Sequence, residues 1–191
     1  MNHRASFVAL VVLGAGLGAA QAAEITRSGS TVFVRGRIEA GDDLKFAEVA
    51  PGGSFRAVEL SSVGGQMLAA GTMARAIKAA GATTIYDAAR GPCSSACTIL
   101  FAAGAQRRYV NSESIREGLG AQGKRGLGYH EARANEAGSS GRAMGAMTAL
   151  YYEMGSPAGA QLSGRSPNRS AYYISGATAV SLGIATSLSR P

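Results

Sequence analysis

The sequence has few groups that can do acid–base or metal chemistry. It contains two histidines and two cysteines. His3 lies in the N-terminal hydrophobic segment, so His130 is the one histidine in the rest of the chain. No cluster of histidine, cysteine and aspartate stands together, and we therefore expect neither a metal site nor a cofactor. This scarcity narrows the search for a catalytic base to one imidazole.

Basic residues outnumber acidic ones, but no aromatic-rich basic motif accompanies them. The chain has 19 lysines and arginines against 12 acidic residues, which gives a formal net charge of +7. The positive residues are scattered along the sequence, which favours a solvated basic surface, and we predict no nucleic-acid partner. Attraction to anionic envelope polymers or membrane faces remains an alternative.

Long hydrophobic runs are absent after the first 22 residues. The run from Phe7 to Leu17 is short for a membrane span, and it leads into Ala20-Gln21-Ala22, which is typical of a signal-peptide cleavage site. We predict a signal peptide at 1–22, cleaved near Ala22, and one domain at 23–191. No stable membrane span is expected, and the processed protein would be periplasmic or secreted.

Strand and helix patterns alternate along the remaining chain. Strands are predicted at 31–35, 56–61, 83–86, 108–110 and 128–130, and helices at 44–50, 67–80, 95–103, 141–154 and 177–185. The glycine-rich segment 111–127 and the Gly, Ser and Pro-rich segment 156–169 are interpreted as loops. The sequence has no internal repeats. This alternation predicts an α/β fold with short crossovers.

Residues 91–97, Gly-Pro-Cys-Ser-Ser-Ala-Cys, combine a tight turn with the start of a small-residue helix. The first N–H groups of a helix have no partner inside it, so they can stabilise an oxyanion beside a serine. Ser95 would have the Ala96 N–H as its donor, whereas Ser94 can serve as the helix cap. We prefer Ser95 as the nucleophile. The Gly64-Gly65 pair can bring a second N–H.

Both cysteines, Cys93 and Cys97, flank the two serines of this turn. An exported protein meets an oxidising environment, and a spacing of four residues can be bridged if one cysteine lies in the turn and the other in the first helical turn. The alternative is a pair of small buried thiols. A disulfide would hold the turn that carries Ser95.

The features follow the order strand, Gly-Gly, helix, strand, turn with serine, buried helix, strand and histidine. This order resembles the Clp protease proteolytic subunit and the wider Clp/crotonase superfamily, from Thr31 to Thr186. In that family a Ser-Pro-Gly-Gly loop supplies one oxyanion donor, a serine after a turn is the nucleophile, and a histidine on a later strand is the base. Ser62-Val63-Gly64-Gly65 matches the loop, and Ser95 and His130 match the other two.

The resemblance implies a single-domain α/β fold, a Clp/crotonase-like spiral of short β-strands with flanking helices. It implies a serine peptidase with Ser95 and His130 as catalytic residues, the N–H groups of Gly65 and Ala96 as the oxyanion hole, and a peptide or protein substrate. The Cys-x-Ser-Ala-Cys form looks most like an exported periplasmic branch. Related folds assemble into rings or trimers, so a homo-oligomer is a further expectation.

The sequence departs from that family at two places. Ser95 and His130 lie 35 residues apart, which is longer than the family's interval, and a surface loop at 111–127 can absorb the surplus at little entropic cost. The position of the family's triad aspartate is Ala171, and no carboxylate lies between Met154 and Pro191.

Without that aspartate, other groups must orient the imidazole. Asn168 and Ser170 are candidates, as an asparagine is in some cysteine proteases. Lys124 is an alternative base if His130 faces away. Losing the orienting carboxylate typically lowers turnover by about 10⁴. Two functions stay open: a hydrolase with a Ser/His pair, or a non-catalytic module that binds peptide or envelope ligands.

Overall fold

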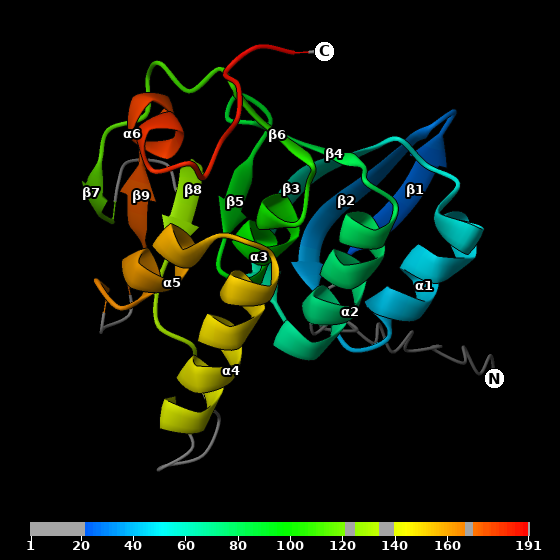
Figure 1. Cartoon of the computed structure of the whole chain (residues 1–191), viewed down its shortest axis with the longest axis horizontal. Helices are drawn as coiled ribbons and strands as arrows, with labels where there is room; N and C mark the ends of the chain where they lie inside the picture. Colours follow the sequence, from blue (N-terminus) through cyan, green and yellow to red (C-terminus); the bar gives the residue numbers. More distant parts are fainter. Residues whose placement is uncertain (1–21, 121–124, 134–139, 167–169, 191) are drawn as a thin grey trace, which may run out of the picture.

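A nine-stranded sheet runs through the molecule, with helices packed against it (Figure 1). The structure, a computed structural model, describes residues 22–120, 125–133, 140–166 and 170–190. The strands are β1 (Glu24–Ser28), β2 (Thr31–Ile38), β3 (Ala57–Gly65), β4 (Thr83–Asp87), β5 (Pro92–Ser94), β6 (Gln106–Val110), β7 (Gly118–Leu119), β8 (Gly126–Tyr129) and β9 (Tyr172–Ile174). The helices are α1 (Asp42–Val49), the 3₁₀ turn η1 (Pro51–Gly53), α2 (Met67–Ala79), α3 (Ala96–Ala102), α4 (Ser140–Glu153), α5 (Pro157–Ser163) and α6 (Gly176–Ser181).

The long strand β3 belongs to both halves of the sheet. It pairs in parallel with β2 along its whole length and with β4 over its first half, and β4 pairs in parallel with β6. Further along, Ser62 of β3 pairs with Cys93 of β5, and β5 continues in parallel to β8. Antiparallel β9 and β7 complete this second half. The end of β3 therefore lies where the two halves diverge, beside the turn between β5 and α3.

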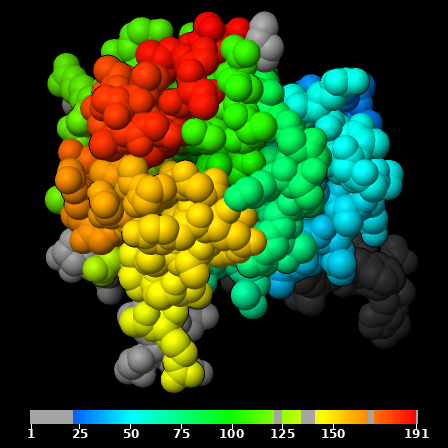
Figure 2. Space-filling view, viewed as in Figure 1, coloured from blue at the N-terminus to red at the C-terminus, as the bar shows by residue number. Residues whose placement is uncertain are grey.

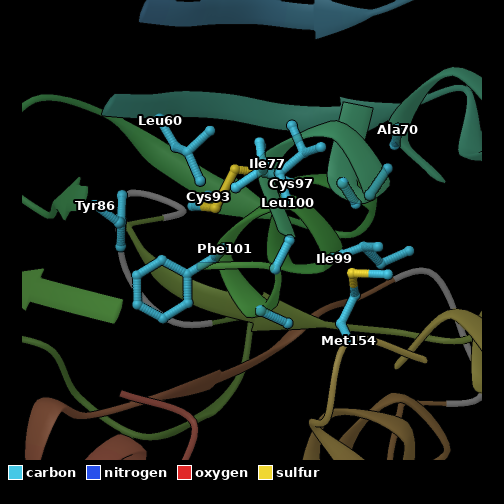
Figure 3. Packing of buried hydrophobic residues seen from close by; sticks show 14 of the residues in the cluster. Leu60, Ala70, Ile77, Tyr86, Cys93, Cys97, Ile99, Leu100, Phe101 and Met154 are labelled. Atoms are coloured by element: carbon cyan, nitrogen blue, oxygen red, sulfur yellow. A yellow bond between two sulfur atoms is a disulfide. The ribbon is translucent and has the colours of Figure 1, made fainter. Parts of the chain in front are cut away.

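Helix α3 forms the centre of the core. All of its residues are buried, as expected from its apolar sequence. Figure 3 shows Ile99, Leu100 and Phe101 of α3 in the same cluster as Leu60 of β3 and Ile77 of α2. Full burial of each such side chain contributes about 1.5–3 kcal/mol to folding, so the helix that begins next to Ser95 is firmly anchored.

Helix α4 closes one side of the molecule. On the face in Figure 2 its surface, in yellow, adjoins that of α2, in green. Arg75 of α2 forms an ion pair with Glu153 of α4 at 2.7 Å. No helix in the described ranges is both long and apolar enough to cross a membrane.

Most of the predicted elements occur within a few residues of their expected bounds. The alternation of strands and helices and the single-domain α/β class are confirmed. The prediction of a loop throughout 156–169 was wrong, because α5 begins at Pro157, where proline suits the first helical turn. The loop predicted at 111–127 contains β7 and the start of β8. His130 follows β8 and does not lie within it.

The Tyr86 hydroxyl links the two halves of the sheet near the turn. Tyr86 of β4 is fully buried; its hydroxyl donates to the Gly91 carbonyl at 2.9 Å and accepts from the Gly126 N–H at 2.8 Å. Burial raises the pKa of this hydroxyl, so it stays protonated and keeps both roles. It therefore connects the turn before β5 to the first residue of β8.

Tyr86→Phe should lower the free energy of unfolding by about 1–3 kcal/mol, because it leaves a buried N–H and a carbonyl without their partner. Urea denaturation measures this change. The control is Tyr152→Phe, whose ring is 60% exposed on α4 and whose change should stay within about 0.5 kcal/mol. Equal effects of the two substitutions would contradict the bridging role.

Candidate active site

Ser95 has an unusual backbone conformation for a residue with a side chain. Its φ is 56° and its ψ is −127°, a sparsely populated region that costs about 1–3 kcal/mol. The surrounding structure holds it there: its N–H donates to Gly128 at 2.8 Å, and its carbonyl accepts from the Thr98 N–H at 2.9 Å and the Thr98 hydroxyl at 2.6 Å. The strain is thus compensated on both sides of the residue.

The Gly64-Gly65 pair packs directly on this turn. Gly64 has φ of 86°, and a Cβ there would lie 2.5 Å from the Ser94 carbonyl oxygen, 2.7 Å from the Ser95 Cβ and 2.8 Å from the Ala96 nitrogen. The Gly64 N–H donates to the hydroxyl of Ser62 at 3.0 Å. Gly65 is therefore the member of the pair with the better claim to an oxyanion-hole N–H.

The two cysteines form a disulfide. Cys93 and Cys97 are bonded, with their Cα atoms 5.3 Å apart, and both are fully buried. The predicted bridge is confirmed in this structure, and the alternative of two buried thiols is wrong. Because Cys93 belongs to β5 and Cys97 to the first turn of α3, the bond closes a short loop around Ser94, Ser95 and Ala96.

One cavity, of about 600 Å³, is lined by residues from the glycine loop, the turn and the segment after β8. Four of the predicted site residues line it: Gly65, Ser95, Ala96 and His130. Ser94 does not; it is 7% exposed, and its hydroxyl lies 3.4 Å from that of Tyr173. The structure therefore places the preferred serine on the cavity and the alternative serine in the interior.

The orientation of His130 follows from its hydrogen bond. Its Nδ1 lies 2.7 Å from the carbonyl oxygen of Glu131. A carbonyl oxygen only accepts, so Nδ1 must carry the proton and Nε2 is left with a lone pair. Nε2 is the nitrogen that a general base needs. The bond to the main chain thus sets the tautomer that a triad aspartate would otherwise set.

Burial lowers the pKa of His130, and the positive charge of Arg133 lowers it further, while the bond to Glu131 opposes both. The imidazole is therefore neutral at neutral pH. No hydrogen bond joins the side chains of Ser95 and His130, both of which are described. Catalytic hydrogen bonds are often long in the free enzyme and tighten with substrate bound.

The other candidate residues fall elsewhere. Ser170 is exposed and makes no hydrogen bond with His130 in the described structure. Asn168 and Lys124 lie outside the described residues. No group of three or more histidine, cysteine or acidic side chains able to hold a metal occurs in the described ranges.

Sequence reasoning missed the charged residues of the cavity. Arg37, Glu39 and Arg133 line it, and Arg37 pairs with Glu39 at 2.8 Å. The strand predicted at 31–35 continues to Ile38 in the structure. Recognising that longer strand in the sequence would have carried the prediction to Arg37 and to Glu39 just beyond it. The role of the Glu131 carbonyl has no sequence signal, because every residue has a carbonyl.

No protein-family model matches the sequence, and no curated protein matches it. Solved structures do share its fold. A ClpP1 mutant from Listeria monocytogenes is 15% identical, with 85% of this chain and 92% of that chain covered and a TM-score of 0.51. The ClpP protease catalytic domain from Plasmodium falciparum is 11% identical, with 85% and 86% covered and a TM-score of 0.56.

A protein assigned as an enoyl-CoA hydratase from Streptomyces coelicolor A3(2) is 14% identical, with 99% of this chain and 72% of that chain covered and a TM-score of 0.50. The chain therefore has the α/β fold shared by ClpP and crotonase-like proteins. At these identities the likeness defines the fold alone, and the function has to be argued from the cavity.

Gly64→Ala should lower the free energy of unfolding by about 3 kcal/mol, since the new Cβ overlaps the turn and the positive φ disfavours alanine. The matched control is Gly145→Ala on the exposed face of α4, where a Cβ meets nothing within 4 Å. It should stabilise the protein by about 1 kcal/mol, because alanine is the better helix former. Urea denaturation measures both changes. An unchanged free energy of unfolding in Gly64→Ala would contradict the close approach of β3 to the turn before α3.

Proposed function

We propose that this protein is an exported serine hydrolase that cleaves peptide bonds through Ser95 and His130. One observation carries the proposal: Ser95, on a strained turn at the start of α3, shares a cavity with an imidazole whose Nε2 is the unprotonated nitrogen. Strain of this kind clusters at functional sites. A serine beside a neutral imidazole is the arrangement of nucleophilic acyl transfer.

Each residue has a role in such a reaction. Nε2 of His130 takes the proton from the Ser95 hydroxyl as its oxygen attacks the substrate carbonyl. The N–H groups of Ala96 and Gly65 donate to the oxyanion. The imidazolium then protonates the leaving amine, and water, activated by the same nitrogen, releases the acyl group from Ser95. A side-chain rotation that brings Ser95 and His130 into hydrogen-bonding contact precedes the first step.

The Glu131 carbonyl makes this a weaker site than a full triad. It fixes the tautomer, but as a dipole it stabilises the imidazolium less than a carboxylate does. Replacing the orienting carboxylate lowers turnover by about 10⁴ in the triad enzymes. We therefore expect slow hydrolysis, suited to accessible, unfolded or short peptides.

The second candidate function is a non-catalytic module that binds peptides or envelope ligands in the same cavity. It is favoured by two observations within the described residues: Ser95 and His130 share no hydrogen bond, and no carboxylate is hydrogen-bonded to His130. The fold alone assigns no function, because its structural neighbours include both proteases and a protein assigned as a hydratase.

The proposal includes export to an oxidising compartment and assembly into a homo-oligomer. The Ala-x-Ala segment before Ala23 and the buried disulfide both suit an oxidising compartment, in keeping with an exported branch of the fold. ClpP-like neighbours favour a homo-oligomer.

A fluorophosphonate probe should label the wild-type protein at Ser95, and Ser95→Ala should remove the labelling. Ser94→Ala is the matched control, since that hydroxyl faces Tyr173 in the interior and should leave labelling within about twofold. His130→Ala should slow labelling by at least about 10², the contribution typical of a general base. In-gel fluorescence and peptide mapping measure these rates. Labelling of the wild type no faster than that of Ser95→Ala would contradict Ser95 as the nucleophile, and no labelling of either protein would favour the binding module.

The labelling rate should depend on pH through His130. Because the pKa of His130 lies below its ordinary value, the neutral base is present at pH 7, and the rate should fall only as the pH drops well below about 6.5. Arg133→Gln removes a positive charge that disfavours the imidazolium, so the acid limb should move to higher pH. Arg142→Gln, on the exposed surface of α4, is the control and should not move it. A shift to lower pH in Arg133→Gln would contradict this electrostatic link.

A further inference from the structure

A buried carboxylate at the start of α1 is hydrogen-bonded to the residue that precedes β1. Asp42 is fully buried. Its Oδ2 accepts from the backbone N–H groups of Ala23, at 3.1 Å, and Glu39, at 2.7 Å. Its Oδ1 accepts from the Lys45 ammonium at 2.8 Å, and the Lys45 side chain is half exposed.

These hydrogen bonds keep Asp42 ionised. Burial raises its pKa, but the bonds from Lys45, the Glu39 N–H and the Ala23 N–H together lower it below the ordinary value. A buried negative charge is costly unless it is paired and fully hydrogen-bonded. Its one charged hydrogen-bond partner in the described structure is Lys45, whose head reaches water.

Ala23, whose N–H bonds Asp42, is also the first residue after the predicted cleavage site. Ala22 is exposed and forms a parallel bridge with Arg37, whereas Ala23 is only 4% exposed. The step from an exposed residue to a buried one therefore falls at the boundary between leader and domain that Ala20-Gln21-Ala22 predicts.

We propose that Asp42 is the binding site for the α-ammonium group that leader removal creates at Ala23. A leader peptidase adds water across the bond between the Ala22 carbonyl carbon and the Ala23 nitrogen. The leader leaves with a carboxylate, and the freed amine takes up a proton at neutral pH. Cleavage precedes folding, because Ala23 is buried in the folded domain.

Charge and position both favour this pairing. The ammonium replaces a neutral amide donor at the same atom, so the contact with Asp42 becomes a charge-assisted hydrogen bond, roughly twice as strong. Cleavage one residue earlier would put the charge on exposed Ala22. Cleavage one residue later would remove the donor and leave Oδ2 of a buried carboxylate with one partner fewer. Of the three possible N-termini, the one at Ala23 therefore gives the most stable folded chain.

The pairing also reaches the wall of the cavity. The oxygen that accepts from Ala23 accepts from the N–H of Glu39 as well. The Glu39 side chain pairs with Arg37, and both line the cavity. The bound N-terminus therefore holds the segment between β2 and α1 in place. This role does not depend on the activity proposed for Ser95.

The first test is the N-terminus of the protein exported by a host cell from the full-length gene. Intact mass and N-terminal sequencing should show a chain that begins at Ala23. The second test compares purified chains that begin at Ala22 and at Ala23, made from a tag whose protease leaves no added residue. The chain from Ala23 should melt at least about 3 °C higher, given about 2–4 °C per kcal/mol for a domain of this size.

Asp42→Asn should abolish this difference, because it removes the charge that binds the ammonium. Asp43→Asn, the neighbouring acidic residue on α1 and half-buried, is the matched control and should leave the difference intact. Should Asp42→Asn fail to fold, N-terminal acetylation of the chain from Ala23 provides a second measurement. It keeps the N–H and removes the charge, so the melting temperature should fall to that of the chain from Ala22.

An exported protein that begins at any other residue would overturn the inference. So would equal melting temperatures of the two chains, a difference that persists in Asp42→Asn, or an acetylated chain as stable as the free one.

Discussion

The close approach of the end of β3 to the turn between β5 and α3 is the contact on which the cavity depends. Gly64 leaves no room for a side chain between itself and Ser94, Ser95 and Ala96. That contact places the backbone of Gly65 and the first N–H of α3 at one cavity. The disulfide between Cys93 and Cys97 and the fully buried α3 hold the turn from the other side. A strained residue at position 95 persists because its neighbours leave it no other conformation.

The chemistry of the cavity then depends on one imidazole without a carboxylate partner. A backbone carbonyl at Nδ1 gives His130 the tautomer of a general base, while burial and Arg133 keep it neutral. A neutral imidazole can start an acyl transfer, but the imidazolium that forms has weaker support than in a full triad. The same geometry therefore accounts for both parts of the proposal, that the cavity suits a hydrolase and that the hydrolysis should be slow.

Much of the fold could be predicted from the sequence because its signals are local. The helical spacing from Met67 and the alternation at 31–35 indicated α2 and β2, and the cysteine spacing suited the bridge that the structure contains. Strands of two or three residues, such as β5 and β9, have too few positions to show a period. Helix α5 was missed because its glycine, serine and proline are typical of loops, although Gly159 is needed where a Cβ would meet the ring of Tyr151.

For the candidate site, the sequence could propose which residues take part, but not which groups contact them. The serine, the glycine pair and the histidine stand out by residue type. The partner of Nδ1, by contrast, is a backbone carbonyl, and the charges at the cavity come from the end of β2, the residues just after it and the segment after His130. Asp42 illustrates the same limit: in the sequence it is one of two acidic residues at a helix start, and only folding buries it against Ala23. Since Glu39 shares that carboxylate oxygen, one buried charge holds both the residue before β1 and a residue of the cavity wall.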